Sequence, residues 1–125
     1  MSKRILVIDD EELLIKTMNK FLEKQGYQVY TAKNGSDAQA LVEEENFDLV
    51  ICDIRMPGQN GVETVKSIKS IMQSNKQRDI PVIFVTGFAD ESIKDEAQKL
   101  KPLSYLMKPF DTQELIAVIK KGIGS

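Results

Sequence analysis

The chain has 125 residues, of which 42% are hydrophobic and 29% charged, and its formal net charge is −2. This length and composition predict one globular domain over residues 1–125. The charge gives no electrostatic basis for direct binding of nucleic acid or of an anionic membrane, and no apolar stretch approaches the ~20 residues that span a bilayer. The absence of histidine excludes catalysis, metal binding and phosphorylation on a histidine of this chain.

Short apolar runs alternate with longer amphipathic segments along the sequence. Five strands are predicted, over residues 5–8, 27–31, 49–52, 82–85 and 103–107. Apolar residues at helical spacing predict a helix after each strand, and Gly26 ends the first of them. The expected caps of the second, fourth and fifth helices are Asn34, Asp90 and Asp111. Because strands buried on both faces are continuously apolar, the pattern predicts an α/β fold with a parallel sheet covered by helices on both faces.

The segment before the predicted fourth strand is polar, and we expect residues 70–79 to form a long loop or a frayed helix end. The N-terminal apolar run is too short for a signal peptide. The single cysteine, Cys52, has no partner for an internal disulfide and is expected to be a small apolar filler. These features predict a cytoplasmic protein.

Charged and polar side chains follow the predicted strands at the point where each one ends. They are Asp9, Asp10 and Glu11 after the first strand, Asp53 after the third, Thr86 after the fourth and Lys108 after the fifth. Binding sites of open parallel sheets form beyond the carboxyl ends of the strands. We therefore expect these side chains to converge at one edge of the sheet.

Each of these residues also has a simpler structural explanation. Asp10 and Glu11 can cap the first helix, and Asp53 can start a turn into Pro57 and Gly58. Taken together, however, neighbouring carboxylates in a crevice raise one another's pKa or require a cation, and oxygen ligands suit Mg²⁺. A nearby lysine and hydroxyl can bind an incoming phosphoryl group, and a carboxylate can itself be the nucleophile that accepts it.

The order of these motifs resembles the receiver domain of two-component response regulators. The resemblance spans residues 3 to about 121 and rests on Asp9-Asp10, on Asp53 followed by MPGQNG, on VTG at 85–87 and on KPF at 108–110. It implies a flavodoxin-like, doubly wound fold with five parallel strands in the order 2-1-3-4-5 and five helices.

The resemblance also implies a role for each matching residue. Asp53 is then the phosphoacceptor. The implied cofactor is Mg²⁺, bound directly by Asp10, mostly through water by Asp9, and also by Asp53 and the backbone carbonyl of Arg55. The chain would be a signalling domain rather than an enzyme, catalysing only its own phosphotransfer and slow autodephosphorylation.

Further implied residues respond to the phosphoryl group. Thr86 would hydrogen-bond a phosphoryl oxygen, Lys108 would pair with the acid and then with the phosphate, and Tyr105 would be the aromatic switch. The Lys108–Pro109 peptide bond is expected to be cis, and Gly61 would close the loop before the third helix. The face formed by the fourth helix, fifth strand and fifth helix would change as a result.

The implied partners are a sensor histidine kinase or a phosphotransfer protein on one side, and an effector or fused output domain of unknown identity on the other. The sequence departs from the family at Lys101-Pro102, where Gly-Ala is common, so the exit of the fourth helix is expected to differ. At the mouth of the site, we hypothesise that Arg55 and Phe88 restrict attacking water.

Two other functions remain as alternatives. A receiver-like interaction module that is never phosphorylated is disfavoured by the complete set of acidic, hydroxyl and lysine residues. A phosphatase with an aspartate nucleophile resembles this pattern, but such enzymes carry a second aspartate two residues after the first, where this chain has Arg55. Nucleotide binding is disfavoured because neither glycine-rich phosphate-binding motif occurs.

Overall fold

The computed structural model describes residues 2–87 and 90–124. Strands and helices alternate along this part of the chain. The strands are β1 (Arg4–Ile8), β2 (Gln28–Ala32), β3 (Leu49–Asp53), β4 (Val82–Thr86) and β5 (Ser104–Met107). The helices are α1 (Glu12–Lys24), α2 (Gly35–Glu44), α3 (Gly61–Ser74), α4 (Glu91–Lys99) and α5 (Thr112–Ile123).

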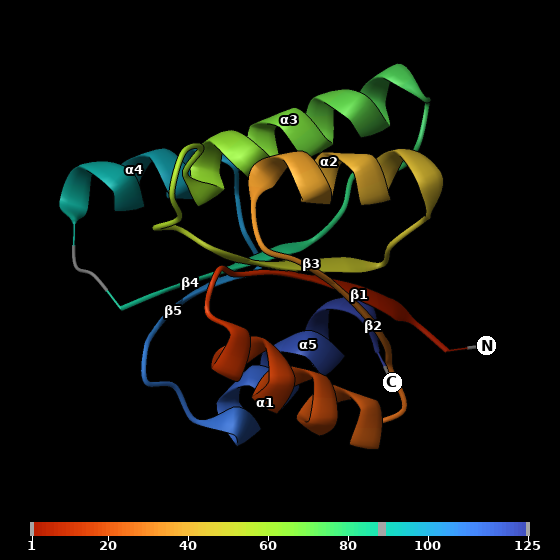
Figure 1. The fold of residues 1–125 in the computed structure, drawn as a ribbon, viewed down its shortest axis with the longest axis vertical. Coiled ribbons are helices and arrows are strands. Elements are labelled where there is room, and N and C mark those ends of the chain that lie inside the picture. The colour runs from red at the N-terminus through yellow and green to blue at the C-terminus, as the bar shows by residue number, and fades with distance from the viewer. Residues whose placement is uncertain (1, 88–89, 125) are drawn as a thin grey trace.

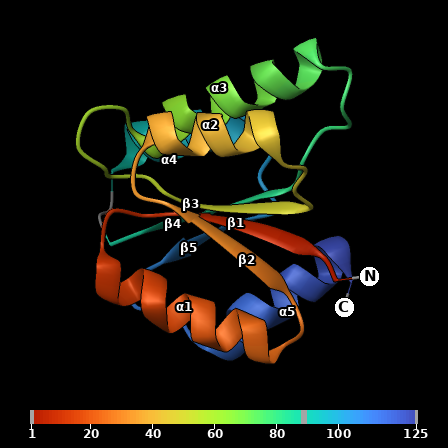
Figure 2. The same cartoon turned by 45° about the vertical axis from the view of Figure 1, so that its right-hand side comes forward.

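The five strands form one parallel sheet in the order β2-β1-β3-β4-β5. Helices α1 and α5 cover one face of the sheet, and α2, α3 and α4 cover the other (Figures 1 and 2). This arrangement confirms the predicted flavodoxin-like fold and its strand order. The strand order reverses between β1 and β3. Open α/β sheets form binding sites at such a switch point.

Each face of the sheet has its own hydrophobic core. Val50 and Cys52 of β3 pack with α2, α3 and α4, whereas Leu49 and Ile51 pack with α1 and α5. Successive side chains of a strand point to opposite faces, so burial of both faces requires every residue of β3 to be buried. The strand therefore carries a buried Asp53 at its carboxyl end as a continuation of the same apolar run.

The predicted helix caps are largely confirmed. The side chains of Asn34, Asp90 and Asp111 each accept hydrogen bonds from backbone N–H groups in the first turn of their helices. Helix α3 begins with a capping box that the sequence analysis did not predict, in which Asn60 and Glu63 each accept a hydrogen bond from the other's backbone. Helix α1 is different, because Glu11 occupies the N-cap position without a side-chain capping bond.

Of the two alternatives predicted for residues 70–79, a helix end is present, since residues 70–74 belong to α3 and the segment from Asn75 onward is a loop. Buried Met72 anchors this last turn to the core. The helix ends in a Schellman motif, where the N–H of Gln77 donates to the carbonyl of Met72 (2.9 Å) and that of Lys76 to Gln73 (3.1 Å). Lys76 adopts the left-handed conformation, with φ of 57°.

Helix α4 ends in a related but incomplete way. Lys101 is left-handed, with φ of 53°, and its N–H donates to the carbonyl of Gln98 at 3.0 Å. The next residue, Pro102, has no N–H, so the second bond of a Schellman motif is lost. The end of α4 therefore differs as predicted, because Lys101 adopts the left-handed conformation that favours glycine.

Gly61 fixes the distance between β3 and α3. Its N–H donates to the carbonyl of Ile54 at 2.8 Å. A Cβ atom at this position would lie 2.1 Å from the carbonyl oxygen of Asp53. Only glycine allows the first turn of α3 to lie this close to the end of β3, and the loop between them is thereby held beside Asp53.

Among the described residues, no helix is both long and apolar enough to cross a membrane.

Replacing Lys76 by glycine is expected to raise the free energy of unfolding by about 0.5–1 kcal/mol, because glycine adopts the left-handed conformation without the clash of a Cβ atom. Urea denaturation monitored by circular dichroism measures the change. Lys66→Gly, an exposed position within the same helix, is the matched control and should lower the value by about 1 kcal/mol. Loss of stability in both variants would contradict the helix end described above.

Gly61→Ala is expected to lower the free energy of unfolding by about 1–3 kcal/mol, even though alanine favours helices, because the new methyl group collides with backbone. Gly87→Ala serves as the control, since the nearest atom of the described residues to its added Cβ, on Lys108, is 3.8 Å away. Equal stabilities of the two variants, measured by thermal denaturation, would argue against the close approach of α3 to β3.

Candidate functional site

The parallel register brings the ends of the central strands to one edge of the sheet. Asp53 ends β3 and pairs with Val85 of β4, while Cys52 pairs with Ile8 of β1. Asp9 follows Ile8 directly, so the Asp9 and Asp53 side chains leave neighbouring strands at the same level. Asp9 is 1% exposed and Asp53 4% exposed. Two carboxylates are thus buried side by side at the switch point of the sheet.

Lys108 reaches this pair from the connection between β5 and α5. Its Nζ lies 3.0 Å from Asp9 Oδ2 and 3.5 Å from Asp53 Oδ2. The backbone holds the lysine in place, because its N–H donates to the carbonyl of Thr86 at 2.7 Å. The expected cis peptide bond between Lys108 and Pro109 is present.

The acidic residues form a cluster that fits a divalent cation. Carboxylate oxygens of Asp9, Asp10 and Asp53 all lie within 4.8 Å of one another, and Asp10 is the exposed member. Hard cations such as Mg²⁺ and Ca²⁺ prefer such oxygen ligands. The structure therefore brings together the three carboxylates that the sequence analysis placed in one site, with the solvent-facing one accessible to an ion.

Burial makes the ionised forms of the two inner carboxylates costly. Desolvation, together with the charge of Asp9, raises the pKa of Asp53 to about 6 despite the opposing effect of Lys108. Desolvation also raises the pKa of Asp9, although hydrogen bonds from the Glu11 N–H and from Lys108 oppose it. Burial by itself lowers the pKa of Lys108, but the hydrogen bonds and charges of the surrounding acids outweigh it and raise the pKa above its usual value. The site carries an excess of negative charge.

Thr86 and Tyr105 lie on the same face of the sheet. Thr86 ends β4 and is 1% exposed. Phe84, two residues earlier on β4, pairs with Tyr105 of β5, and both rings pack into the core beneath α3 and α4. Tyr105 is partly buried, and Lys94 Nζ of α4 lies 5.7 Å from the centre of its ring. A movement of the Thr86 side chain would therefore change the space available to the Tyr105 ring and to α4.

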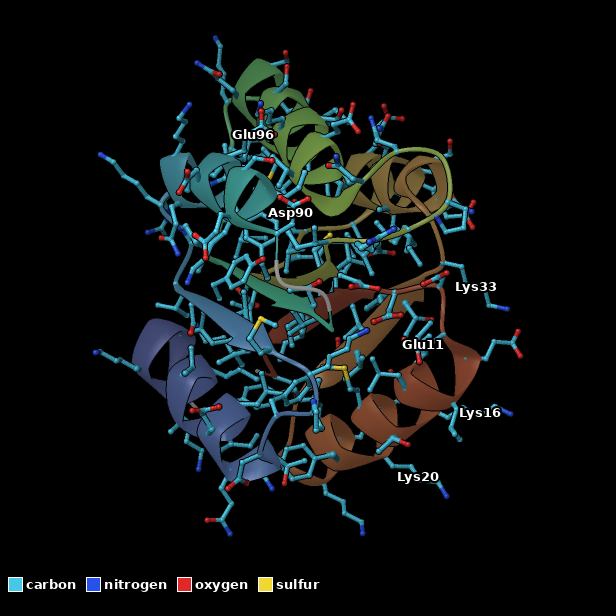
Figure 3. The ribbon with its side chains drawn as sticks, turned by 90° about the vertical axis from the view of Figure 1, so that its left-hand side faces the viewer. Glu11, Lys16, Lys20, Lys33, Asp90 and Glu96 are labelled. Carbon is cyan, nitrogen blue, oxygen red and sulfur yellow. The ribbon has the colours of Figure 1, made fainter. Side chains whose placement is uncertain are left out.

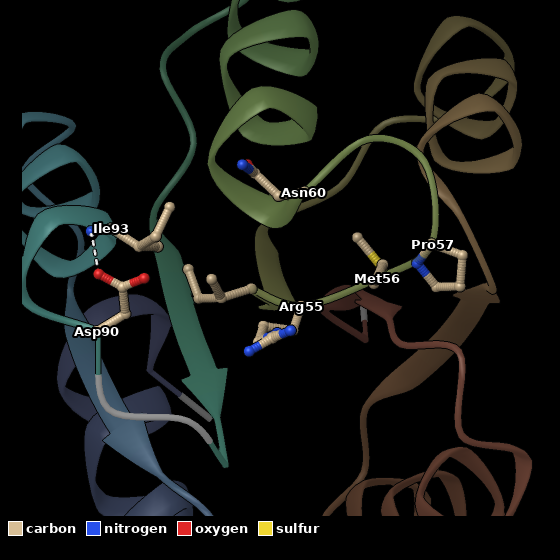
Figure 4. A pocket seen from close by; sticks show the side chains of 7 residues that line it. Arg55, Met56, Pro57, Asn60, Asp90 and Ile93 are labelled. Atoms are coloured by element: carbon tan, nitrogen blue, oxygen red, sulfur yellow. Dashed lines mark hydrogen bonds between the residues drawn. The ribbon is translucent and has the colours of Figure 1, made fainter.

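A pocket of about 560 Å³ opens between the β3–α3 connection and the start of α4. Figure 4 shows Asp90 on one side, Met56 and Pro57 on the other, and Arg55 between them. Hydrogen bonds from Ser92 and Ile93, and more weakly the charge of Arg55, lower the pKa of Asp90. Arg55 lines this pocket, while Phe88 lies outside the described residues.

Glu11 is one of the residues expected to converge at this edge of the sheet, with capping of the first helix as the simpler alternative. Its side chain makes no capping bond. Asp9 Oδ1 instead accepts the Glu11 backbone N–H at 2.9 Å, and the Glu11 side chain reaches Lys108 Nζ at 3.2 Å. Its position directly after Asp10 was the only signal in the sequence. Cys52 behaves as predicted, fully buried as a small filler beneath Asp53.

Comparisons with known proteins agree with this geometry. A family model described as the response regulator receiver domain matches residues 5–120. A receiver domain protein of Methanospirillum hungatei is similar, with 28% identity over 98% of this chain and 94% of that chain and a TM-score of 0.89. A receiver domain of Clostridium thermocellum has 32% identity over 97% and 94% of the two chains, with a TM-score of 0.85.

A third structure, a response regulator of Burkholderia pseudomallei, is described with a phosphorylated aspartic acid, a calcium ion and citrate. It has 28% identity with this chain, covering 94% of this chain and 66% of that one, and a TM-score of 0.82. The family match covers nearly the whole chain, and the fold and strand order agree with it. This chain belongs to the response regulator receiver domain family.

Proposed function

We propose that residues 1–125 act as one receiver domain that accepts a phosphoryl group on Asp53, as part of two-component signalling. The observation that carries the proposal is the placement of a buried carboxylate next to two further carboxylates and 3.5 Å from the Lys108 ammonium. Receiver domains are signalling domains, and the phosphoryl donor is a phosphohistidine. Because this chain has no histidine, the donor belongs to a partner, a sensor histidine kinase or a phosphotransfer protein in the cytoplasm.

In the transfer step, a carboxylate oxygen of Asp53 attacks phosphorus in line with the bond from phosphorus to the donor imidazole. The new O–P bond forms as the N–P bond breaks, and the imidazole nitrogen keeps the electron pair. Lys108 balances the charge of the phosphoryl oxygens, and the Thr86 hydroxyl donates a hydrogen bond to one of them. The same groups remain around the acyl phosphate. Water then slowly attacks its phosphorus, the bond from phosphorus to the Asp53 oxygen breaks, and the carboxylate and inorganic phosphate are released.

The residues that would hold Mg²⁺ are Asp10 directly, Asp9 mostly through water, Asp53, and Arg55 through its backbone carbonyl. Bound there, the ion would offset the negative charge that burial and the acidic neighbours concentrate at this edge of the sheet. The exposure of Asp10 next to two buried carboxylates supports this assignment. So does the similar Burkholderia structure with its calcium ion and phosphorylated aspartic acid.

The output of the proposed switch is a change in the surface made by α4, β5 and α5. Once Asp53 carries a phosphoryl group, Thr86 moves toward it, and Tyr105 turns inward into the space that Thr86 leaves. Their placement on one face of the sheet supports this coupling. The surface would then recognise an effector protein or a fused output domain, with no direct role for nucleic acid or membrane.

Two alternatives are less well supported. An aspartate-dependent phosphatase needs an acid two residues after the nucleophile, and Arg55 stands there. A receiver-like module that is never phosphorylated would have no use for two buried carboxylates whose pKa values are raised by desolvation, that of Asp53 also by the charge of Asp9. The free-energy cost of burying these carboxylates favours the phosphoacceptor function.

Incubation with acetyl phosphate and Mg²⁺ is expected to add one phosphoryl group, seen as a gain in intact mass. Asp53→Asn should show no gain, because an amide is not a nucleophile here. Chelation of Mg²⁺ should prevent the gain in the unchanged protein. An equal gain in the Asp53→Asn variant would show that another residue is the acceptor.

Asp53→Asn is also expected to stabilise the metal-free protein, and to do so in a pH-dependent manner. The pKa of Asp53 is about 6 in the folded state against 3.8 for the unfolded chain. The folded state therefore binds this proton more tightly, and the free energy of unfolding falls as pH rises from about 4 to about 6, by up to about 3 kcal/mol. The variant lacks this contribution, so its advantage should be small at pH 4 and full above pH 7.

Urea denaturation in the presence of a chelator, at pH values from 4 to 8, measures this difference. Added Mg²⁺ should stabilise the unchanged protein more than the Asp53→Asn variant, since the ion compensates the same charge. Parallel pH dependences of the two proteins would contradict the electrostatic cost assigned to Asp53.

A further inference from the structure

The Lys108 ammonium is shared unequally among three carboxylates. It donates hydrogen bonds to Asp9 Oδ2 at 3.0 Å and to Glu11 Oε1 at 3.2 Å. Its distance to Asp53 Oδ2 is 3.5 Å, beyond the usual hydrogen-bond range of about 2.7–3.2 Å. The lysine therefore lies closer to Asp9 and Glu11 than to Asp53, with which it still forms an ion pair.

The Glu11 side chain has no part in shaping its own helix. It provides no capping bond for α1, and its backbone N–H is already bound by Asp9. Figure 3, which looks onto the edge where the strands end, shows Glu11 at the head of α1, across the site from Asp90 at the head of α4. From there the Glu11 side chain, which is 63% exposed, meets the Lys108 side chain, which is 17% exposed.

Phosphoryl uptake adds a new partner for Lys108, whose Nζ, now 3.5 Å from Asp53 Oδ2, must move closer to Asp53 to bind it. An ammonium has three N–H donors, two of which are bound to Asp9 and Glu11. An incoming phosphoryl group on Asp53 brings oxygens that need the same ammonium, whereas Asp9 is fixed by burial and by the Glu11 N–H. The contact with Glu11, on the exposed side, is the one that can be released.

We propose that Glu11 is a positioning residue that holds Lys108 back from Asp53 in the resting protein and thereby slows phosphoryl uptake. This inference rests on the proposed function of Asp53. Glu11 acts through Lys108 and touches neither the phosphoryl donor nor the attacking oxygen. Because the ion pair is partly exposed, the restraint is worth up to about fivefold in rate.

The test measures uptake from acetyl phosphate at saturating Mg²⁺ by intact mass over time. In this reaction the Asp53 oxygen bonds to phosphorus as the P–O bond to the acetyl group breaks, and acetate leaves with the electron pair. Glu11→Gln removes the charge and keeps the length of the side chain, and it should raise the maximal rate about threefold to fivefold. Glu12→Gln is the matched control, because Glu12 pairs with Lys33 on the exposed side of α1 and should leave the rate unchanged.

Glu11→Asp separates contact from charge. The shorter side chain keeps the negative charge but no longer reaches Lys108, so it should accelerate uptake as Glu11→Gln does. A purely structural role would instead appear as a loss of unfolding free energy without acceleration.

The outcomes that overturn the inference are distinct. A wild-type rate for Glu11→Gln would show that Glu11 does not restrain Lys108. Acceleration by Glu11→Gln but not by Glu11→Asp would assign the effect to repulsion of the phosphoryl donor by charge. Absence of any mass gain in all variants, the unchanged protein included, would overturn the proposed function and this inference with it. Uptake at equal rates by the unchanged protein and Glu11→Gln would overturn the inference alone.

Discussion

The burial of Asp9 and Asp53 beside one another is the constraint on which the rest of the site depends. Two carboxylates at the ends of neighbouring parallel strands cannot both ionise without compensation, and desolvation raises the pKa of each. Lys108 provides part of that compensation from the far end of the chain. The remaining negative charge, extended outward by Asp10, is the feature that fits a cation and that supports the proposed phosphoacceptor role of Asp53.

The fold maintains this costly arrangement through rigid neighbours rather than through the acids themselves. β3 is buried along its whole length, and Gly61 allows α3 to begin against the carbonyl of Asp53. The lysine is anchored by a backbone bond to Thr86, which also lies beside the proposed phosphoryl position. The connection between β5 and α5, which carries Lys108, therefore links the charges of the site to β4, β5 and the surface around Tyr105.

The central strands β1, β3 and β4 could be predicted to within about one residue because buried strands are continuous apolar runs. The exact end of α3 could not, because the polar residues 73–79 allow either a loop or a frayed helix end. The left-handed conformations of Lys76 and Lys101 could not be predicted either, because lysine has no preference for that conformation. For the site, motif order predicted which residues meet, but the partner of Glu11 could not be predicted.

The sequence by itself determined the fold class, the strand order through its resemblance to the receiver family, and the set of acids, hydroxyl and lysine at the strand ends. These features are local, since each depends on periodicity or on position relative to one strand. Only the tertiary structure decided how the single Lys108 ammonium is divided among Asp9, Glu11 and Asp53. That division depends on distances between segments nearly a hundred residues apart, which are set by sheet register and helix packing rather than by neighbours in the chain.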